Sequence, residues 1–173
     1  MRLVEVEQFA DGIAATPWFA RVGELLSADD RAKHAAYVSG LGLAAGEPVR
    51  VASWTEAARI ANDPDWDIAW WDAEAGEQKR LQEAAERRYG SERALATLTR
   101  VTDAALIPTR AAADKAPDEA LARVAAGAAA HACHQAALVL ACEAEPHAFL
   151  AKHLLFAAGR WPLGRTAGRW YLF

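Results

Sequence analysis

Residues 117–142, PDEALARVAAGAAAHACHQAALVLAC, decide the fold of this chain. They predict one helix of about seven turns, with Pro117 in the first turn, where a proline is tolerated. From residue 124 to residue 142 the sequence contains no Lys, Arg, Asp or Glu. A helix that is apolar on every side is normally buried. We therefore predict that it is the central helix of a bundle, and its polar side chains in that span are His131, His134 and Gln135.

Length and composition predict one globular domain over residues 1–173. A chain of 173 residues can bury about 70% of its unfolded surface. It is 53% hydrophobic and contains seven Trp, which favours a packed core over disorder. The net charge is −4 and Lys and Arg are not clustered, so we do not expect a nucleic-acid partner.

Three features favour a cytoplasmic protein. The uncharged run at 124–142 is about as long as a membrane span, but it is mostly Ala and holds two His and a Gln, so we expect no membrane insertion. The first residues carry early acidic side chains and no apolar signal core. Cys133 and Cys142 would lie ~13 Å apart along one helix, beyond disulfide reach, so both are predicted to be reduced.

The rest of the chain predicts further helices and a small β element. Ser27 with Asp30 resembles a capping box, and Ser53 with Glu56 is another. Thr16-Pro17 also reads as a helix start, leading through residue 26. The aromatic tail at about 161–173 predicts a hairpin that turns near Ala167-Gly168. Short apolar runs near residues 3–6 and 49–52 could extend this β element.

The fold class is therefore mainly α: a single-domain helical bundle around the buried helix at 117–142, with a small C-terminal hairpin. We find no nucleotide-binding loop, no nucleophile elbow and no CxxC motif in the sequence. Standard nucleotide, hydrolase and redox chemistry is therefore not indicated.

Two pairs of polar residues with helical spacing predict a metal site. His131 and His134 form HxxH on the central helix, and Glu74 and Glu77 form ExxE between Trp70 and Leu81 on another apolar stripe. Two imidazoles and two carboxylates would suit Zn²⁺, Mn²⁺ or Fe²⁺ in a mononuclear centre. The alternative is that each group is simply hydrogen-bonded inside the protein or at its surface.

In that metal centre, a bound water would act as nucleophile or base. A carboxylate of Glu74 or Glu77, or the imidazole of His34, would then transfer the proton, which makes these three the candidate catalytic residues. An early histidine with a later histidine pair superficially resembles the DinB-type thiol-transferase bundles. That family spaces its late histidines as HxxxH, whereas this chain has HxxH.

Aromatic residues suggest two further roles. Trp66 and Trp70, together with Gln135, could line an apolar ligand pocket, although Trp at helical spacing is more often core. The C-terminal tail could dock a partner protein or a second copy of the chain, or its side chains could close the end of the bundle. We favour closure.

The sequence thus supports two functions and leaves open whether the chain is an enzyme. The first is a non-catalytic module that binds a partner protein or a small apolar ligand. The second is a metal-dependent enzyme that uses the Glu/His site. The first is preferred because no specific catalytic motif is present.

Overall fold

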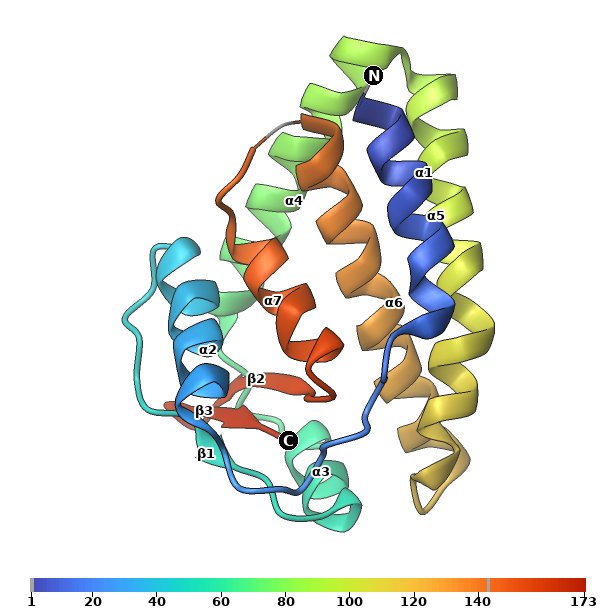
Figure 1. The fold of residues 1–173 in the computed structure, drawn as a ribbon. Coiled ribbons are helices and arrows are strands. Elements are labelled where there is room, and N and C mark those ends of the chain that lie inside the picture. The colour runs from blue at the N-terminus through green and yellow to red at the C-terminus, as the bar shows by residue number, and fades with distance from the viewer. Residues whose placement is uncertain (1, 143) are drawn as a thin grey trace.

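Helix α6 (Glu119–Cys142) lies at the centre of the structure, a computed structural model that describes residues 2–142 and 144–173 (Figure 1). Leu138 and Val139 are fully buried, as are most of the alanines along the helix. Small side chains allow neighbouring helices to approach closely on several sides. The predicted mainly α fold around this helix is confirmed.

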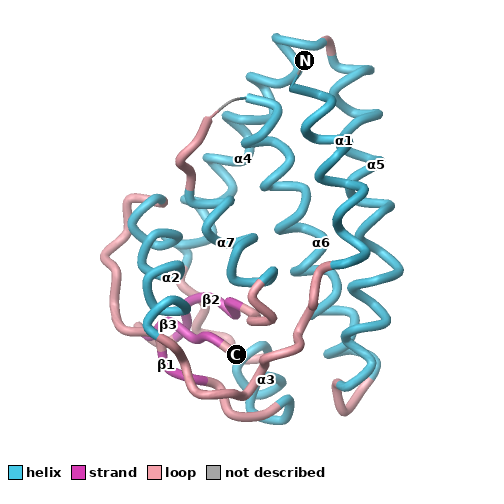
Figure 2. Tube along the Cα trace, viewed as in Figure 1, coloured by secondary structure: helices cyan, strands magenta, loops and turns pink. Residues whose placement is uncertain are grey.

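Four helices pack against α6: α1 (Arg2–Gly12), α4 (Ile68–Tyr89), α5 (Ser91–Ala112) and α7 (Ala148–Ala157). The tube view shows α6 among them (Figure 2). A further helix, α2 (Ala28–Gly40), packs against α7. A Cβ atom added to Gly40 would lie 2.9 Å from the Cβ of Ala148, so this close crossing requires glycine.

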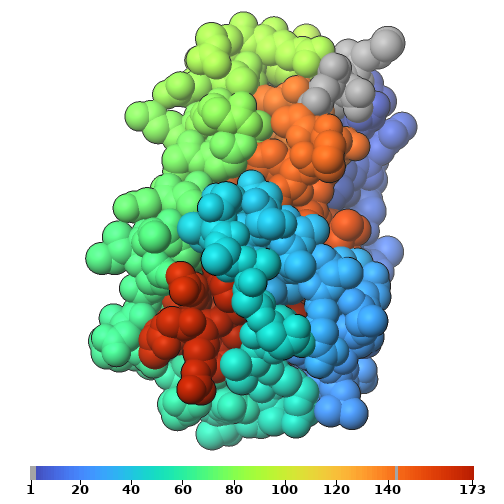
Figure 3. Space-filling view, turned by 90° about the vertical axis from the view of Figure 1, so that its left-hand side faces the viewer, coloured from blue at the N-terminus to red at the C-terminus, as the bar shows by residue number. Residues whose placement is uncertain are grey.

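A three-stranded sheet lies at one end of the bundle. Strands β2 (Pro162–Thr166) and β3 (Arg169–Leu172) form the predicted hairpin, and β1 (Val49–Arg50) pairs in parallel with β3. Ala167 and Gly168 both have positive φ, at 47° and 74°, as in a type I′ turn. In the space-filling view the C-terminal residues fill the gap between α4 and the segment after α2 (Figure 3).

Short connecting elements complete the chain. Helix α3 (Trp54–Ala61) contacts β2, and the 3-10 turns η1 (Ile13–Ala15) and η2 (Ala113–Lys115) follow α1 and α5. Both predicted caps form, since the Ser27 side chain accepts a hydrogen bond from the backbone of Asp30, and Ser53 accepts one from that of Glu56.

Two local predictions were wrong. Residues 3–6 lie in α1 and not in a strand, because Leu3, Val6 and Ala10 are buried at helical spacing. Residues 16–26 form turns and not a helix. Phe19 has a φ of 56°, which a helix does not accommodate.

The buried guanidinium of Arg160 explains the turns at residues 16–26. It donates hydrogen bonds to the carbonyl oxygens of Arg21, Glu24 and Leu25, at 2.6, 3.0 and 2.7 Å. Its remaining charge is paired with Asp30 at 2.9 Å, and both side chains are completely buried. Backbone carbonyl groups that would accept hydrogen bonds within a helix therefore accept them from a residue near the opposite end of the chain.

By length and composition, α6 is the one helix in the described part of the chain that could cross a membrane. Core helices of folded proteins pass the same test, and 67% of its apolar window is buried inside the protein.

The aromatic side chains of the tail lie in the interior. Trp161, Trp170 and Phe173 are 1–3% exposed, and Tyr171 is half-buried. Docking through these buried side chains would require the tail to leave this core.

Truncation after Gly159 should therefore unfold or aggregate the protein. It removes Arg160 and three buried aromatic side chains worth about 1.5–3 kcal/mol each, a large share of the free energy of unfolding of a domain. Thermal melting and light scattering would measure the effect, with Arg169→Ala, an exposed change in the same hairpin, as control. A truncated chain that stays folded and monomeric would show that the hairpin is dispensable.

Candidate functional site

A buried ion pair joins α4 to α7. The Lys152 ammonium contacts both carboxylate oxygens of Glu74, at 2.7 and 3.0 Å, and both residues are 7% exposed. Its third hydrogen bond goes to Oε1 of Gln135 on α6, at 3.1 Å. Gln135 is the polar residue of α6 that is fully buried, and it is bound to Lys152. Helices α4, α6 and α7 therefore meet at this point.

Two aromatic side chains extend the ion pair into a hydrogen-bonded network. The Tyr37 hydroxyl donates to Oε1 of Glu74 and accepts a hydrogen bond from Nε1 of Trp70 at 2.8 Å. On the other side, Nε2 of Gln135 donates to Oε1 of Gln78 at 3.2 Å. All three hydrogens of the lysine are used, so the buried charge of Lys152 is fully hydrogen-bonded within the network.

The charges of this network follow from its contacts. Burial by itself would raise the pKa of Glu74, but the charge of Lys152 and hydrogen bonds from Lys152, Tyr37 and Gln135 bring it below its ordinary value. Burial, and then the negative charge of Glu74, raise the pKa of Tyr37 well above 10. At neutral pH Glu74 is therefore ionised and Tyr37 is neutral.

An aromatic cavity of about 530 Å³ opens directly onto this network. Glu74 and Lys152 form part of its lining, together with the side chains of four tryptophans: Trp66, Trp70, Trp71 and Trp161. The hairpin contributes Pro162 and Leu163, and α6 contributes Val124, Gly127, Ala128 and His131. The cavity thus lies between α4, α6 and the start of β2.

Gly164 in β2 allows the hairpin to pack against Trp70, which lines the cavity. A Cβ atom added to Gly164 would lie 2.2 Å from Cη2 of Trp70, and its φ of 113° also disfavours other residues. Gly164 therefore lets the hairpin lie directly on the indole ring of Trp70. The predicted pocket residues Trp66 and Trp70 both line the cavity.

A second hollow of about 500 Å³ shares Trp71, Glu74 and His131 with the first. It runs along the same two helices, and its remaining lining is mostly polar: Ala75, Gln78, Lys79, Gln82 and Gln135. We call the two hollows together the α4–α6 groove. Its aromatic half is the cavity, and its polar half is this second hollow.

The four predicted metal ligands are not brought together. His131 lines the groove, and its ring is stacked near-parallel to that of His134 with the centroids 6.3 Å apart. Glu74 is committed to Lys152, and Glu77 is bound by Arg80 and by Nε2 of His147 at 2.6 Å. Among residues 2–142 and 144–173, no three His, Cys, Asp or Glu side chains converge on a metal position.

The Glu77 carboxylate belongs to a separate structural contact. Hydrogen bonds from Arg80, and then from His147, lower its pKa to about 2, so it is ionised at neutral pH. His147 caps α7 by accepting the backbone N–H of Phe149 on Nδ1, which leaves the proton on Nε2 facing Glu77. This contact fixes the start of α7.

His34 lies behind the network and is 1% exposed. Its ring packs edge-on against Tyr37 and Trp170, with centroids 6.4 and 5.6 Å away, and its Nδ1 has no hydrogen-bond partner within the described structure. Burial lowers the pKa of His34 to about 4. The imidazole is therefore neutral at pH 7, and it lies beyond Tyr37, one residue removed from Glu74.

Sequence reasoning missed Lys152, Tyr37 and Gln78. A usable signal exists for Lys152, the one charged residue of α7: it shares a stripe at i, i+3 and i+7 with two buried aromatics, Phe149 and Phe156. A lysine on an apolar stripe requires a buried partner. No comparable signal in the sequence marks Tyr37.

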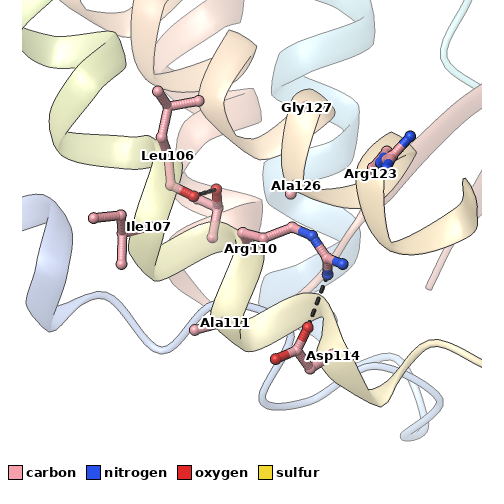
Figure 4. A pocket seen from close by; sticks show the side chains of 9 residues that line it. Leu106, Ile107, Arg110, Ala111, Asp114, Arg123, Ala126 and Gly127 are labelled. Atoms are coloured by element: carbon pink, nitrogen blue, oxygen red, sulfur yellow. Dashed lines mark hydrogen bonds and ion pairs between the residues drawn. The ribbon is translucent and has the colours of Figure 1, made fainter. Parts of the chain in front are cut away.

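Another hollow, of about 610 Å³, lies between α5 and α6 (Figure 4). Leu106 and Ile107 line it and are exposed, and its charged groups are already paired. Arg110 bonds Asp114 at 2.8 Å and also binds Glu119. This hollow therefore offers less to a ligand than the groove does.

Comparison of the chain with protein-family models, with curated proteins and with solved structures finds no match. The fold and the site therefore define the chain only as a helical bundle with a buried polar network beneath an aromatic cavity.

Lys152→Met should cost about 3–5 kcal/mol of unfolding free energy, because it leaves the Glu74 carboxylate buried without its partner. The double variant Lys152→Met, Glu74→Gln should be more stable than this single variant, since no buried charge remains. Urea unfolding would measure the natural chain, Lys152→Met, Glu74→Gln and the double variant, with Arg100→Ala, which breaks an exposed pair with Asp11, as a control below about 1 kcal/mol. If the losses of unfolding free energy caused by Lys152→Met and Glu74→Gln simply added in the double variant, the two side chains would not be energetically coupled.

Stability should fall as the pH drops below 6.5, because the pKa of buried His34 is about 4 when folded and near 6.5 when unfolded. The unfolded chain then binds a proton that the folded chain does not, so the stabilisation present above pH 6.5 is lost towards pH 4. Burial also lowers the pKa of His131, His134 and His153, which makes the loss of stability with falling pH steeper. Carboxylates such as Glu74, whose pKa is lowered in the folded protein, change the stability only below about pH 4.5.

His34→Phe should reduce the loss of stability between pH 7.5 and pH 5 by roughly 2 kcal/mol. Urea midpoints of the natural chain and the variant at the two pH values would measure this difference. An unchanged pH dependence would show that His34 is not buried as a neutral imidazole.

Proposed function

We propose that this chain binds a small, mainly apolar molecule in the aromatic half of the α4–α6 groove. The observation that carries the proposal is the cavity of about 530 Å³ walled by four tryptophans. Its volume lies in the range of small-molecule sites, which are typically apolar with a few fixed polar groups.

The polar network supports binding through apolar contacts. Lys152 and Glu74 already satisfy one another, and Gln135 completes the lysine's hydrogen bonds. A ligand that broke these bonds would leave a buried charge without a partner, which costs several kcal/mol. The network is therefore better suited to hold the floor of the cavity than to bond a ligand or to transfer protons.

The mouth of the cavity provides a driving force for binding. Trp71 and Val124 both line it, and they are 54% and 52% exposed. Covering apolar surface of this kind releases about 25 cal/mol per Å². Indole rings also offer flat faces for stacking against an aromatic or alkyl body.

The neutral probe 6-phenylhexan-1-ol should bind the natural chain and change its tryptophan fluorescence, because Trp66, Trp70 and Trp71 line the cavity. Calorimetry should show a negative heat-capacity change. Ala128→Phe, which places a ring in the cavity from α6, should weaken binding by at least about tenfold, the effect of roughly 1.4 kcal/mol.

The matched control is Ala111→Phe, which adds the same ring to the hollow between α5 and α6. It should leave the affinity for the probe unchanged. No binding up to the solubility limit of the probe, or equal losses in both variants, would contradict this cavity as the binding site.

A further inference from the structure

The polar half of the α4–α6 groove carries an uncompensated positive charge. Lys79, an exposed residue, lines this half, and it forms no ion pair with the described residues. Glu74, the carboxylate in the lining, is neutralised by Lys152 at 2.7 Å. Partial burial and the charge of Lys152 lower the pKa of His131, so its ring adds no positive charge at neutral pH.

Hydrogen-bond donors accompany that charge. Oε1 of Gln78 accepts from Gln135, whereas the side-chain N–H groups of Gln78 have no partner among the described residues. Gln82 uses its own amide nitrogen to bind Glu86 at 2.7 Å. Lys79 and the amide nitrogen of Gln78 are therefore a cation and a donor that remain for a ligand at this end.

We infer that the ligand is an amphiphilic monocarboxylate: its apolar body lies in the aromatic half and its carboxylate lies at Lys79 and Gln78. This inference rests on the proposed function and adds the class and orientation of the ligand. The two halves share Trp71, Glu74 and His131, so one molecule can occupy both.

The charge inventory favours a single negative charge over other heads. A cationic head would meet Lys79 with no free carboxylate in the groove to balance it. A doubly charged phosphate would have one charge more than the groove compensates. A carboxylate matches one ammonium and one amide donor, with bonds of the charge-assisted kind.

Three probes with a common apolar body test the inference: 6-phenylhexanoate, 6-phenylhexan-1-ol and 6-phenylhexylamine. Titration of the natural chain at pH 7.5, followed by tryptophan fluorescence and calorimetry, should show the carboxylate binding about threefold to fivefold more tightly than the alcohol, and the amine most weakly. The preference should shrink in high salt, because the lysine is exposed.

Lys79→Glu should remove the preference for the carboxylate over the alcohol. Lys115→Glu, which makes the same change of net charge on an exposed residue outside the groove, should retain the preference. Gln78→Ala should reduce the preference partially.

The outcomes separate this inference from the proposed function. Equal affinities for the three probes, or equal effects of Lys79→Glu and Lys115→Glu, would overturn the carboxylate inference while the cavity remained a binding site. A failure of the alcohol to bind would overturn the proposed function itself. Tighter binding of the amine than of the carboxylate would reverse the assigned charge.

Discussion

The absence of charge around helix α6 is the constraint on which the rest of the structure depends. A helix with no ionised side chain from residue 124 to residue 142 can be buried on most sides, and its alanines let other helices approach closely. Polar groups that are buried against it need hydrogen-bond partners within the protein. Gln135, which is buried, meets this requirement by accepting from Lys152 and donating to Gln78. The buried network is thus a consequence of the central helix.

The C-terminal hairpin depends on the same core and also shapes the cavity. Arg160 fixes its start by binding the turns near the N-terminus, and Trp161, Pro162 and Leu163 then form one wall of the cavity. Gly164 allows the strand to pack on Trp70. Residues far apart in the sequence therefore enclose a space that no single helix pair would form. Stability and the proposed ligand binding would be linked here, because side chains that close the bundle also line the cavity.

The choice between the two functions considered for this chain depends on which partners the carboxylates find. Glu74 and Glu77 lie one turn apart, yet one is paired with Lys152 and the other with Arg80 and His147. Each carboxylate is satisfied by a cation, which leaves the HxxH pair without the two oxygen ligands that a mononuclear centre would need. The groove that remains between α4 and α6 suits a molecule held by apolar contacts.

By itself, the sequence determined the features that depend on local periodicity and composition. Helix α6, the caps at Ser27 and Ser53 and the turn at Ala167-Gly168 all follow from local sequence. Only the tertiary structure decided which distant groups meet. The turns at residues 16–26 and the pairing of Glu74 with Lys152 arise from contacts across more than 70 residues, and a buried charge takes whichever partner packing brings within reach.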